Sequence, residues 1–274
     1  MPSQIQYKTK DKIKRKNTKK QNKRQKTKDK NFFCLCLYSR LGKRWLLESL
    51  ITQVPPPSLS TMAALIIVDI QKDFFPGGSL TVAGADEIVP LINKLRDTLD
   101  VFAVFLTKDW HPADHCSFAD NHYTKENDSD ELGICMLEKI VLPTGEEQIL
   151  WPRHCVKGSS GADFHNDLNV KINDKIVIKG LRSDTDCYSG FGSAPRPHGS
   201  RVEVTTLDGL LYSCGIKEVF IVGLAFDHCV KATAIDAVKL GYKTTVIREA
   251  TRAMSAETAI IAEAEMIAAG VIIR

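Results

Sequence analysis

The sequence from residue 62 to residue 274 predicts an α/β fold, in which a doubly wound, mostly parallel sheet is flanked by helices. Short, continuous apolar runs recur along this part of the chain, and segments with helical periodicity lie between them. Continuous apolar runs are typical of strands buried on both faces, as in a parallel sheet. Reactive side chains follow directly after several of these runs, and ligands bind at that edge of such sheets.

The first expected strand, residues 64–68, is an unbroken apolar run. Runs of the same character predict further strands at residues 101–106, 176–178, 219–222, 244–247 and 271–273. Helical patterns occur at residues 85–98, 207–214, 227–240 and 256–269. Because strands alternate with helices, right-handed crossovers should place helices on both faces of the sheet. The polar stretch 121–148 has no clear period, and we expect it to cover the site as an insertion.

The two ends of the chain differ in charge. Residues 1–61 contain 16 basic and 3 acidic residues, a net charge of +13, whereas the rest contains 21 basic and 30 acidic residues, a net charge of −9. A segment with repeated like charges and few apolar residues cannot bury a core. Residues 1–61 are therefore predicted to be a disordered basic extension that ends in a Pro-rich linker, Pro55-Pro56-Pro57, and residues 62–274 to be one folded domain.

The basic extension has two interpretations. One is a nuclear-localisation or nucleic-acid-binding arm; the other, which we favour, is a solvated tail or sequence upstream of a true start at Met62. Nucleic acid is not an expected partner of the folded domain, since phosphate contacts need clustered Lys and Arg and this domain is acidic. No membrane association is expected, because the apolar stretch 32–38 is shorter than the ~20 residues that span a bilayer. Eight scattered cysteines without a secretory signal indicate reduced thiols and a cytoplasmic location, with the nucleus as an addition.

Cys229 is the strongest candidate nucleophile. It lies in the segment 223–230, where an expected strand runs into an expected helix. Unpaired N–H groups and the helix dipole favour a thiolate in the first turn of a helix, and the same N–H groups can bind an oxyanion. The alternative is a packed small residue, but the other seven cysteines lack such a turn. The adjacent His228 is interpreted as a lining or surface residue, because successive helix residues point apart.

Two charged residues at strand ends are candidate partners for this thiol. Asp69 follows an apolar run, where partial desolvation would raise its pKa and suit it to accept a thiol proton. Lys179 ends another apolar run and is expected to pair with the carboxylate and to stabilise negative charge at the sulfur. Asp73 is interpreted as an N-cap or turn residue.

Asp109 and His111 belong to an Asp-Trp-His segment at the end of the second expected strand. Residues two apart on a strand project to the same side and can chelate one ion. Carboxylate and imidazole donors suit Zn²⁺, Fe²⁺ or Mn²⁺. His154 is the best candidate for a third ligand, with His115 and Ser117 as lesser ones.

Together these segments closely resemble the nicotinamidases of the isochorismatase-like hydrolase superfamily, over about residues 64–274. The resemblance is carried by Val68-Asp69-Ile70-Gln71-Lys72-Asp73-Phe74, Asp109-Trp110-His111-Pro112, Trp151-Pro152-Arg153-His154-Cys155, Lys179-Gly180 and the segment 223–230. The order of acid, Asp-x-His, His, Lys and Cys along the chain is far more specific than any single motif. Residues 1–61 take no part in it.

The resemblance implies that residues 62–274 form an isochorismatase-like hydrolase domain with a Rossmann-like three-layer fold. The implied activity is hydrolysis of nicotinamide to nicotinate and ammonia in NAD salvage, through a thioester on a cysteine. The implied catalytic residues are Asp69, Lys179 and Cys229. The implied metal ligands are Asp109, His111 and His154, for one divalent ion that is zinc first and iron or manganese as alternatives. The implied oxyanion hole consists of the backbone N–H groups of Ala225 and Cys229, with a cis peptide bond before Ala225. The implied substrate pocket contains Phe74, Trp151 and Tyr188, and Asp186 falls where some members have an acid near the metal.

Two other functions are weighed against this one. A metal-free cysteine amidohydrolase of the same superfamily, acting on an N-carbamoyl or ureido substrate, would share the acid, the lysine and the cysteine but generally lacks the three metal ligands. A non-enzymatic protein would work through its basic arm.

Phe226 and His228 depart from the family, which often has a small residue and a tyrosine there. The expected partner is the small-molecule substrate, and the oligomeric state is open, a homo-oligomer included.

Overall fold

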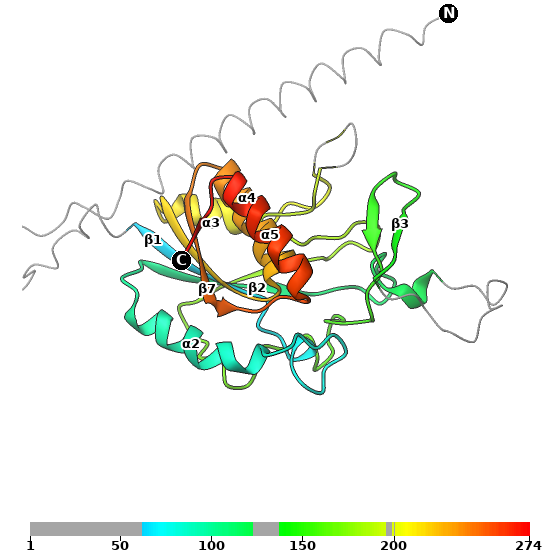
Figure 1. Ribbon diagram of the computed structural model, residues 1–274, viewed down its shortest axis with the longest axis horizontal. Helices are drawn as coiled ribbons and strands as arrows, with labels where there is room; N and C mark the ends of the chain where they lie inside the picture. The colour runs from blue at the N-terminus through cyan, green and yellow to red at the C-terminus, as the bar shows by residue number, and fades with distance from the viewer. Residues whose placement is uncertain (1–61, 123–136, 196–198, 200) are drawn as a thin grey trace, which may run out of the picture. The chain divides into compact units, whose positions relative to one another are not determined.

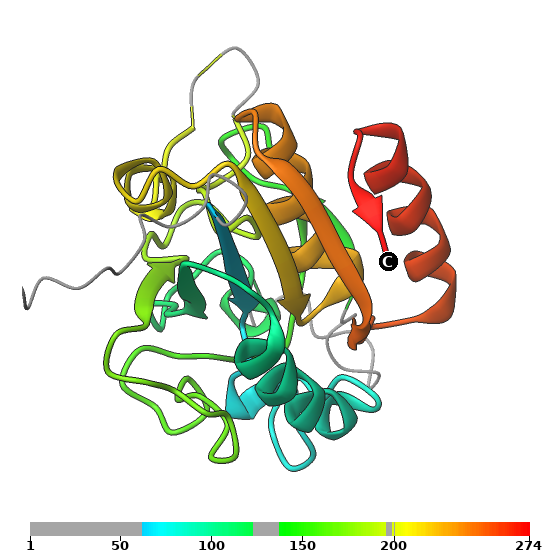
Figure 2. The same cartoon turned by 90° about the vertical axis from the view of Figure 1, so that its left-hand side faces the viewer.

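The computed structural model describes residues 62–122, 137–195, 199 and 201–274. Its main element is a six-stranded sheet with the strand order β5-β2-β1-β6-β7-β8, in which every neighbouring pair is parallel (Figures 1 and 2). The strands are β1 (Ala63–Val68), β2 (Ala103–Asp109), β5 (Lys175–Lys179), β6 (Glu218–Gly223), β7 (Lys243–Thr251) and β8 (Ile272–Ile273). The predicted α/β fold is confirmed.

Helices cover both faces of the sheet, as Figure 1 shows. Helix α2 (Ala85–Thr98) packs on one face, and α3 (Leu207–Ser213), α4 (Lys231–Lys239) and α5 (Ala256–Ala268) pack on the other. All six residues of β1 are buried: Ile66 belongs to the core beneath α3, α4 and α5, while Leu65 belongs to the core beneath α2. Burial on both faces explains why this strand is continuously apolar.

The strand order reverses between β1 and β6. From β1 the chain moves outward to β2 and β5, and then returns to the other side of β1 to form β6, β7 and β8. The carboxyl ends of β1 and β6 therefore flank the crevice where ligands bind in open α/β sheets.

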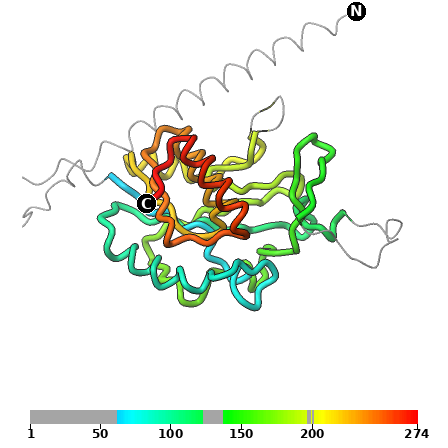
Figure 3. Tube along the Cα trace, viewed as in Figure 1, coloured from blue at the N-terminus to red at the C-terminus, as the bar shows by residue number. Residues whose placement is uncertain are grey.

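A small hairpin differs from the expectation for residues 121–148. Strands β3 (Lys139–Val141) and β4 (Glu147–Ile149) pair antiparallel around a turn in which Gly145 has a φ of +86°. Each strand is only three residues long, which is too short for a periodic pattern to be recognised. Figure 3 shows the hairpin, in green, at the end of the sheet away from the C-terminus. Residues 123–136 of the same stretch lie outside the described residues.

The predictions for the N-terminal part, including the linker at residues 55–57, also lie outside the described residues. Within the described ranges, no helix combines the length and the apolar character that crossing a membrane requires.

Candidate active site

Four neighbouring strands position the predicted catalytic residues and the first predicted metal ligand, whereas His154 follows β4 of the small hairpin. Asp69 follows β1, Asp109 ends β2, Lys179 ends β5, and Cys229 lies six residues beyond the end of β6. Asp109 and Lys179 are direct partners in the register of β2 and β5, and Val68 is paired with Gly223. Parallel strands bring their carboxyl ends to the same edge, so residues far apart in the chain meet there.

Gly223 allows β1 and β6 to end side by side. Its φ is +117°, and a Cβ at this position would lie 2.1 Å from the carbonyl oxygen of Val68. The peptide bond between Leu224 and Ala225 is cis, at the position that the resemblance implies. The chain then forms a π-helical turn, η4 (Phe226–Val230), before α4 begins. Cys229 therefore lies in this π-turn, and not in the first turn of an α-helix as predicted.

Lys179 is a fully buried ammonium group between two carboxylates and the thiol. Its Nζ lies 2.6 Å from Asp109 Oδ1, 2.9 Å from Asp69 Oδ2 and 3.4 Å from Cys229 Sγ, and it donates a hydrogen bond to the carbonyl of Cys187 at 3.1 Å. Burial acts to lower the pKa of this lysine, but Asp109 and Asp69 outweigh burial and hold it well above its usual range. The side chain is thus a fixed positive charge.

Asp69 has the environment predicted for a base. It is fully buried, and burial raises its pKa to about 6, against the opposing effect of Lys179. Its Oδ1 accepts a hydrogen bond from Thr107 Oγ1 at 2.6 Å. Its φ of 48° is a left-handed conformation that is uncommon for a residue other than glycine and often occurs at functional sites.

Cys229 is a neutral thiol in this environment. Burial raises its pKa well above the usual range, although Lys179 acts in the opposite direction. The net direction is opposite to the thiolate that the start of a helix was expected to favour. Since the sulfur must lose its proton to attack, a neighbouring base is required. Asp69 is the candidate base, because Asp69 and Cys229 contact the same ammonium group, that of Lys179.

Asp109, His111 and His154 form a compact set of possible metal donors. Their ligand atoms all lie within 4.8 Å of one another, and all three side chains are buried. His111 Nδ1 lies 3.1 Å from the carbonyl oxygen of Gly180, and His154 Nδ1 lies 2.7 Å from that of Pro152. Carbonyl contacts of this kind fix the ring orientation and leave Nε2 free for an ion.

The charges of these groups also suit a cation. Burial opposes ionisation of Asp109, but Lys179 and His111 outweigh it and lower the pKa of this carboxyl. Burial and the neighbouring His111 lower the pKa of His154 to about 4, so its imidazole is neutral near pH 7. A carboxylate and a neutral imidazole are the forms that bind divalent metals. At His111 burial acts to lower the pKa, but Asp109 outweighs burial and raises it, so an ion would compete with a proton there. The donor types fit one divalent ion.

The two lesser candidates, His115 and Ser117, lie beside this set. His115 Nδ1 is 2.7 Å from Ser117 Oγ, and its ring packs against that of His111 with 4.1 Å between centroids and an interplanar angle of 36°. His115 Nε2 is buried and has no hydrogen-bond partner among the described residues. With His111 and Asp186 it forms a second group of close donor atoms. Ser117 is thus placed to orient His115.

An aromatic cavity opens beside Cys229. The three predicted pocket residues, Phe74, Trp151 and Tyr188, all line it, as do Ala225 and several metal donors. Trp151 Nε1 donates a hydrogen bond to the Tyr188 hydroxyl at 2.8 Å. The sequence did not identify three further lining residues, Leu80, Cys187 and Met254, because all of them lie between regular elements and belong to no motif.

His228 also lines this cavity, as predicted, with its ring edge-on to Trp151 at 4.9 Å. Burial lowers its pKa. The wall of the cavity therefore carries the rings of Phe74, Trp151 and Tyr188 beside the imidazole of His228, and it fits a flat, aromatic ligand.

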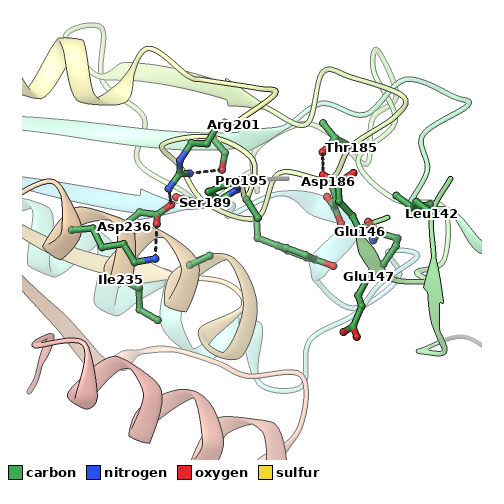
Figure 4. Close-up of a pocket in the computed structure, with 16 residues that line it drawn as sticks. Leu142, Glu146, Glu147, Thr185, Asp186, Ser189, Pro195, Arg201, Ile235 and Asp236 are labelled. Carbon is green, nitrogen blue, oxygen red and sulfur yellow. Dashed lines mark hydrogen bonds and ion pairs between the residues drawn. The ribbon is translucent and has the colours of Figure 1, made fainter. Parts of the chain in front are cut away.

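A second cavity, of about 280 Å³, shares only Asp186 and Tyr188 with the first (Figure 4). An ion pair between Arg201 and Asp236, at 2.6 Å, lies at one end, and Glu146 lies at the other. Although this cavity is larger, its lining includes neither Cys229 nor the metal donors. We therefore assign the chemistry to the smaller cavity.

Gln71 and Asp73, two residues of the segment that follows β1, hold parts of the site in place by hydrogen bonds. Gln71 Nε2 donates to the carbonyl of Asp109 at 2.8 Å, and Gln71 Oε1 accepts from the N–H of Asp109 at 2.8 Å. Asp73 Oδ2 accepts from the N–H of Cys155 at 2.7 Å, so Asp73 holds the segment that carries His154. Asp73 was predicted to be only a capping or turn residue, and its long-range contact had no signal in the sequence.

A parallel sheet with helices on both faces and a buried thiol, an ammonium group and an acid at its switch point has the organisation of a hydrolase with a cysteine nucleophile. Residues 63–273 match the family model described as Isochorismatase domain. The chain belongs to the isochorismatase family.

Curated relatives are similar over most of this domain. A nicotinamidase of Acinetobacter baylyi is 44% identical over 209 residues, which are 76% of this chain and 90% of that protein. A nicotinamidase of Saccharomyces cerevisiae is 40% identical over 206 residues, which are 73% of this chain and 92% of that protein.

Solved structures agree with the fold. A nicotinamidase and pyrazinamidase of Acinetobacter baumannii is 41% identical, with a TM-score of 0.68, and covers 78% of this chain and 95% of its own. The pyrazinamidase of Pyrococcus horikoshii in complex with zinc is 32% identical, with a TM-score of 0.59 and coverages of 78% and 98%. The yeast nicotinamidase bound to the inhibitor nicotinaldehyde is 34% identical, with a TM-score of 0.66 and coverages of 77% and 98%.

Proposed function

We propose that this protein is a nicotinamidase that hydrolyses nicotinamide to nicotinate and ammonia and so acts in NAD salvage. One observation carries the proposal: the thiol of Cys229 and the donor set Asp109, His111 and His154 line the same aromatic cavity. Nicotinamide carries both a reactive carboxamide and a ring nitrogen. Its site therefore needs the nucleophile and the metal donors in one cavity. The names of the relatives support the same activity.

In the proposed first half-reaction, Asp69 accepts the thiol proton of Cys229, and the resulting thiolate attacks the carbonyl carbon of the amide. The positive charge of Lys179 stabilises the sulfur anion, and the N–H groups of Ala225 and Cys229 bind the oxyanion. When the tetrahedral species collapses, the C–N bond breaks and Asp69 returns the proton to nitrogen, so that ammonia leaves and a thioester remains.

In the second half-reaction, water attacks the thioester and gives a proton to Asp69. The C–S bond breaks, nicotinate is released, and the proton returns to the sulfur of Cys229. Phe74, Trp151 and Tyr188 would hold the ring in both steps. Because the nucleophile must remain a free thiol, the proposal includes a reducing compartment such as the cytoplasm.

Asp109, His111 and His154 would hold a divalent ion. When bound, the ion supplies a Lewis-acid contact for the pyridine nitrogen and thereby orients the ring. We propose zinc, because two imidazoles and one carboxylate form a frequent zinc ligand set and a relative was solved in complex with zinc. Iron and manganese also accept these donors.

The test is ammonia release by the purified protein from nicotinamide and from several N-carbamoyl and ureido compounds. The proposal expects nicotinamide to be turned over far faster than the others, together with one divalent ion per chain. Faster release from a ureido compound, by a metal-free protein, would instead identify the alternative amidohydrolase.

A further inference from the structure

Glu203 is a buried carboxylate that holds the turn after Lys179. It is 8% exposed, and it belongs to none of the motifs that carry the resemblance. Its Oε1 accepts a hydrogen bond from the N–H of Gly180 at 2.7 Å, and its Oε2 accepts one from the N–H of Leu181 at 3.0 Å. Both carboxylate oxygens are therefore used to hold two successive backbone groups.

The same turn holds His111. The carbonyl oxygen of Gly180 lies 3.1 Å from His111 Nδ1. The two residues are also in close contact, because a Cβ added to Gly180, whose φ is +69°, would lie 2.4 Å from Cε1 of the His111 ring. A small shift of the turn would therefore either break the contact with Nδ1 or push the ring away.

Glu203 is itself fixed through its backbone. Its N–H donates to Ser193 Oγ at 3.1 Å, and its carbonyl accepts from the N–H of Ser193 at 2.9 Å. A chain of hydrogen bonds thus runs from Ser193 through Glu203 and Gly180 to the imidazole of His111.

We propose that Glu203 is a positioning residue for the metal centre. It holds Gly180 so that the carbonyl fixes a proton on His111 Nδ1 and directs the lone pair of Nε2 to the ion. The inference rests on the proposed function to the extent that Asp109, His111 and His154 bind a metal. Groups that orient a metal-binding histidine from outside the ligand set commonly change metal affinity when they are removed.

The test compares zinc affinity of the full-length protein with that of Glu203→Ala and Glu203→Gln, by competition with a chelating indicator. Affinity should fall about 10- to 100-fold in Glu203→Ala, as for other such groups. Glu203→Gln should lose less, because the amide oxygen can still accept one of the two N–H groups.

Asp174→Asn is a matched control for loss of stability. The carboxylate of Asp174 is also buried: it accepts the backbone N–H of Lys171 at 2.7 Å and forms an ion pair with Arg96 at 2.7 Å. Asp174 directly precedes β5 and so lies at the opposite end of that strand from Lys179 and the site. It should lower the melting temperature and leave zinc affinity unchanged.

The outcomes separate this inference from the proposed function. If the wild type binds zinc and both Glu203 variants bind it equally well, the inference is wrong while the metal site stands. An equal loss of affinity in Asp174→Asn and in the Glu203 variants would also overturn it, because the effect would then be general destabilisation. A wild type that binds no zinc, iron or manganese overturns the metal site and this inference together.

Discussion

The Nζ of Lys179 lies 3.4 Å from the sulfur of Cys229 in a site from which water is largely excluded. Lys179 also pairs with Asp69 and Asp109, so one ammonium group compensates two buried carboxylates and stands ready to compensate a thiolate. Burial raises the pKa of the Cys229 thiol, while the ammonium group that would stabilise a thiolate is already in contact with the sulfur.

Replacing Cys229 by alanine should abolish deamidation, because no other described thiol contacts Lys179 Nζ. We expect kcat to fall by about 10⁴- to 10⁶-fold, as when nucleophiles of other hydrolases are removed. Cys214→Ala, at the C-cap of α3, is the control and should keep full activity. If the Cys229 variant released ammonia from nicotinamide at the wild-type rate, Cys229 would not be the nucleophile.

Replacing Lys179 by methionine should affect both stability and rate. Removal of the ammonium leaves Asp69 and Asp109 buried without their shared partner, which should cost about 3–5 kcal/mol in the free energy of unfolding. If Lys179→Met still folds, its kcat should fall on the order of 10²- to 10³-fold, since the sulfur anion has lost its stabilising charge. Chemical denaturation and steady-state kinetics measure the two effects. A variant with wild-type kcat would show that Lys179 only supports the fold.

Activity should fall in acid with a midpoint near pH 6. Asp69 must be ionised to accept the thiol proton, and burial raises its pKa to about 6. Below this value kcat/KM should decrease about tenfold per pH unit, as for a single essential base. Thr107→Val is the diagnostic variant: it removes the hydrogen bond that lowers this pKa, so the midpoint should move to higher pH. An unchanged midpoint in that variant would exclude Asp69 as the titrating group.

The same pKa has an opposite effect on stability. Because the pKa of Asp69 is raised from 3.8 to about 6 in the folded state, this group favours folding below pH 4, and its contribution is lost as the pH rises through about 6. Titration of Asp69 should therefore not unfold the protein in acid. Circular dichroism at pH 5 is expected to show native structure where activity has already declined, and unfolding at pH 6 would contradict this explanation.

Replacing His111 by alanine should remove most of the bound metal. The loss of one of three donors should weaken zinc binding by more than about 100-fold, the upper end of the effect of removing an orienting group. KM for nicotinamide should rise or kcat should fall, because the ring is no longer oriented. His165→Ala, whose ring packs on Phe75, is the control. Elemental analysis after dialysis, followed by kinetics, tests the role, and full metal content with wild-type kinetics would refute it.

Deleting residues 1–61 should leave activity and thermal stability unchanged. We propose that the folded domain comprises residues 62–274, since β1 begins at Ala63 and all the proposed catalytic residues follow it. Kinetics and melting curves of the shortened and full-length proteins provide the comparison. Salt-sensitive DNA binding that is lost with the deletion would instead support a nucleic-acid-binding arm.

The sequence alone determined the fold class and most of the candidate site. Buried parallel strands are apolar on both faces, so their ends are visible as the point where an apolar run meets a reactive residue, as at Asp69 and Lys179. Since ligands bind at that edge, the chain order and the resemblance together were enough to select Asp109 and Cys229. The short hairpin β3–β4 was missed because three residues carry no measurable period.

Only the tertiary structure decided how these groups act on one another. The lateral strand order places Lys179 and Asp109 in register, and this order depends on long-range pairing that no local pattern encodes. Burial raises the pKa of the Cys229 thiol, an effect opposite to the one expected from the local helix signal. Glu203 and His111 are connected only through the backbone of Gly180, and a contact between side chain and backbone across distant segments leaves no spacing or motif in the sequence.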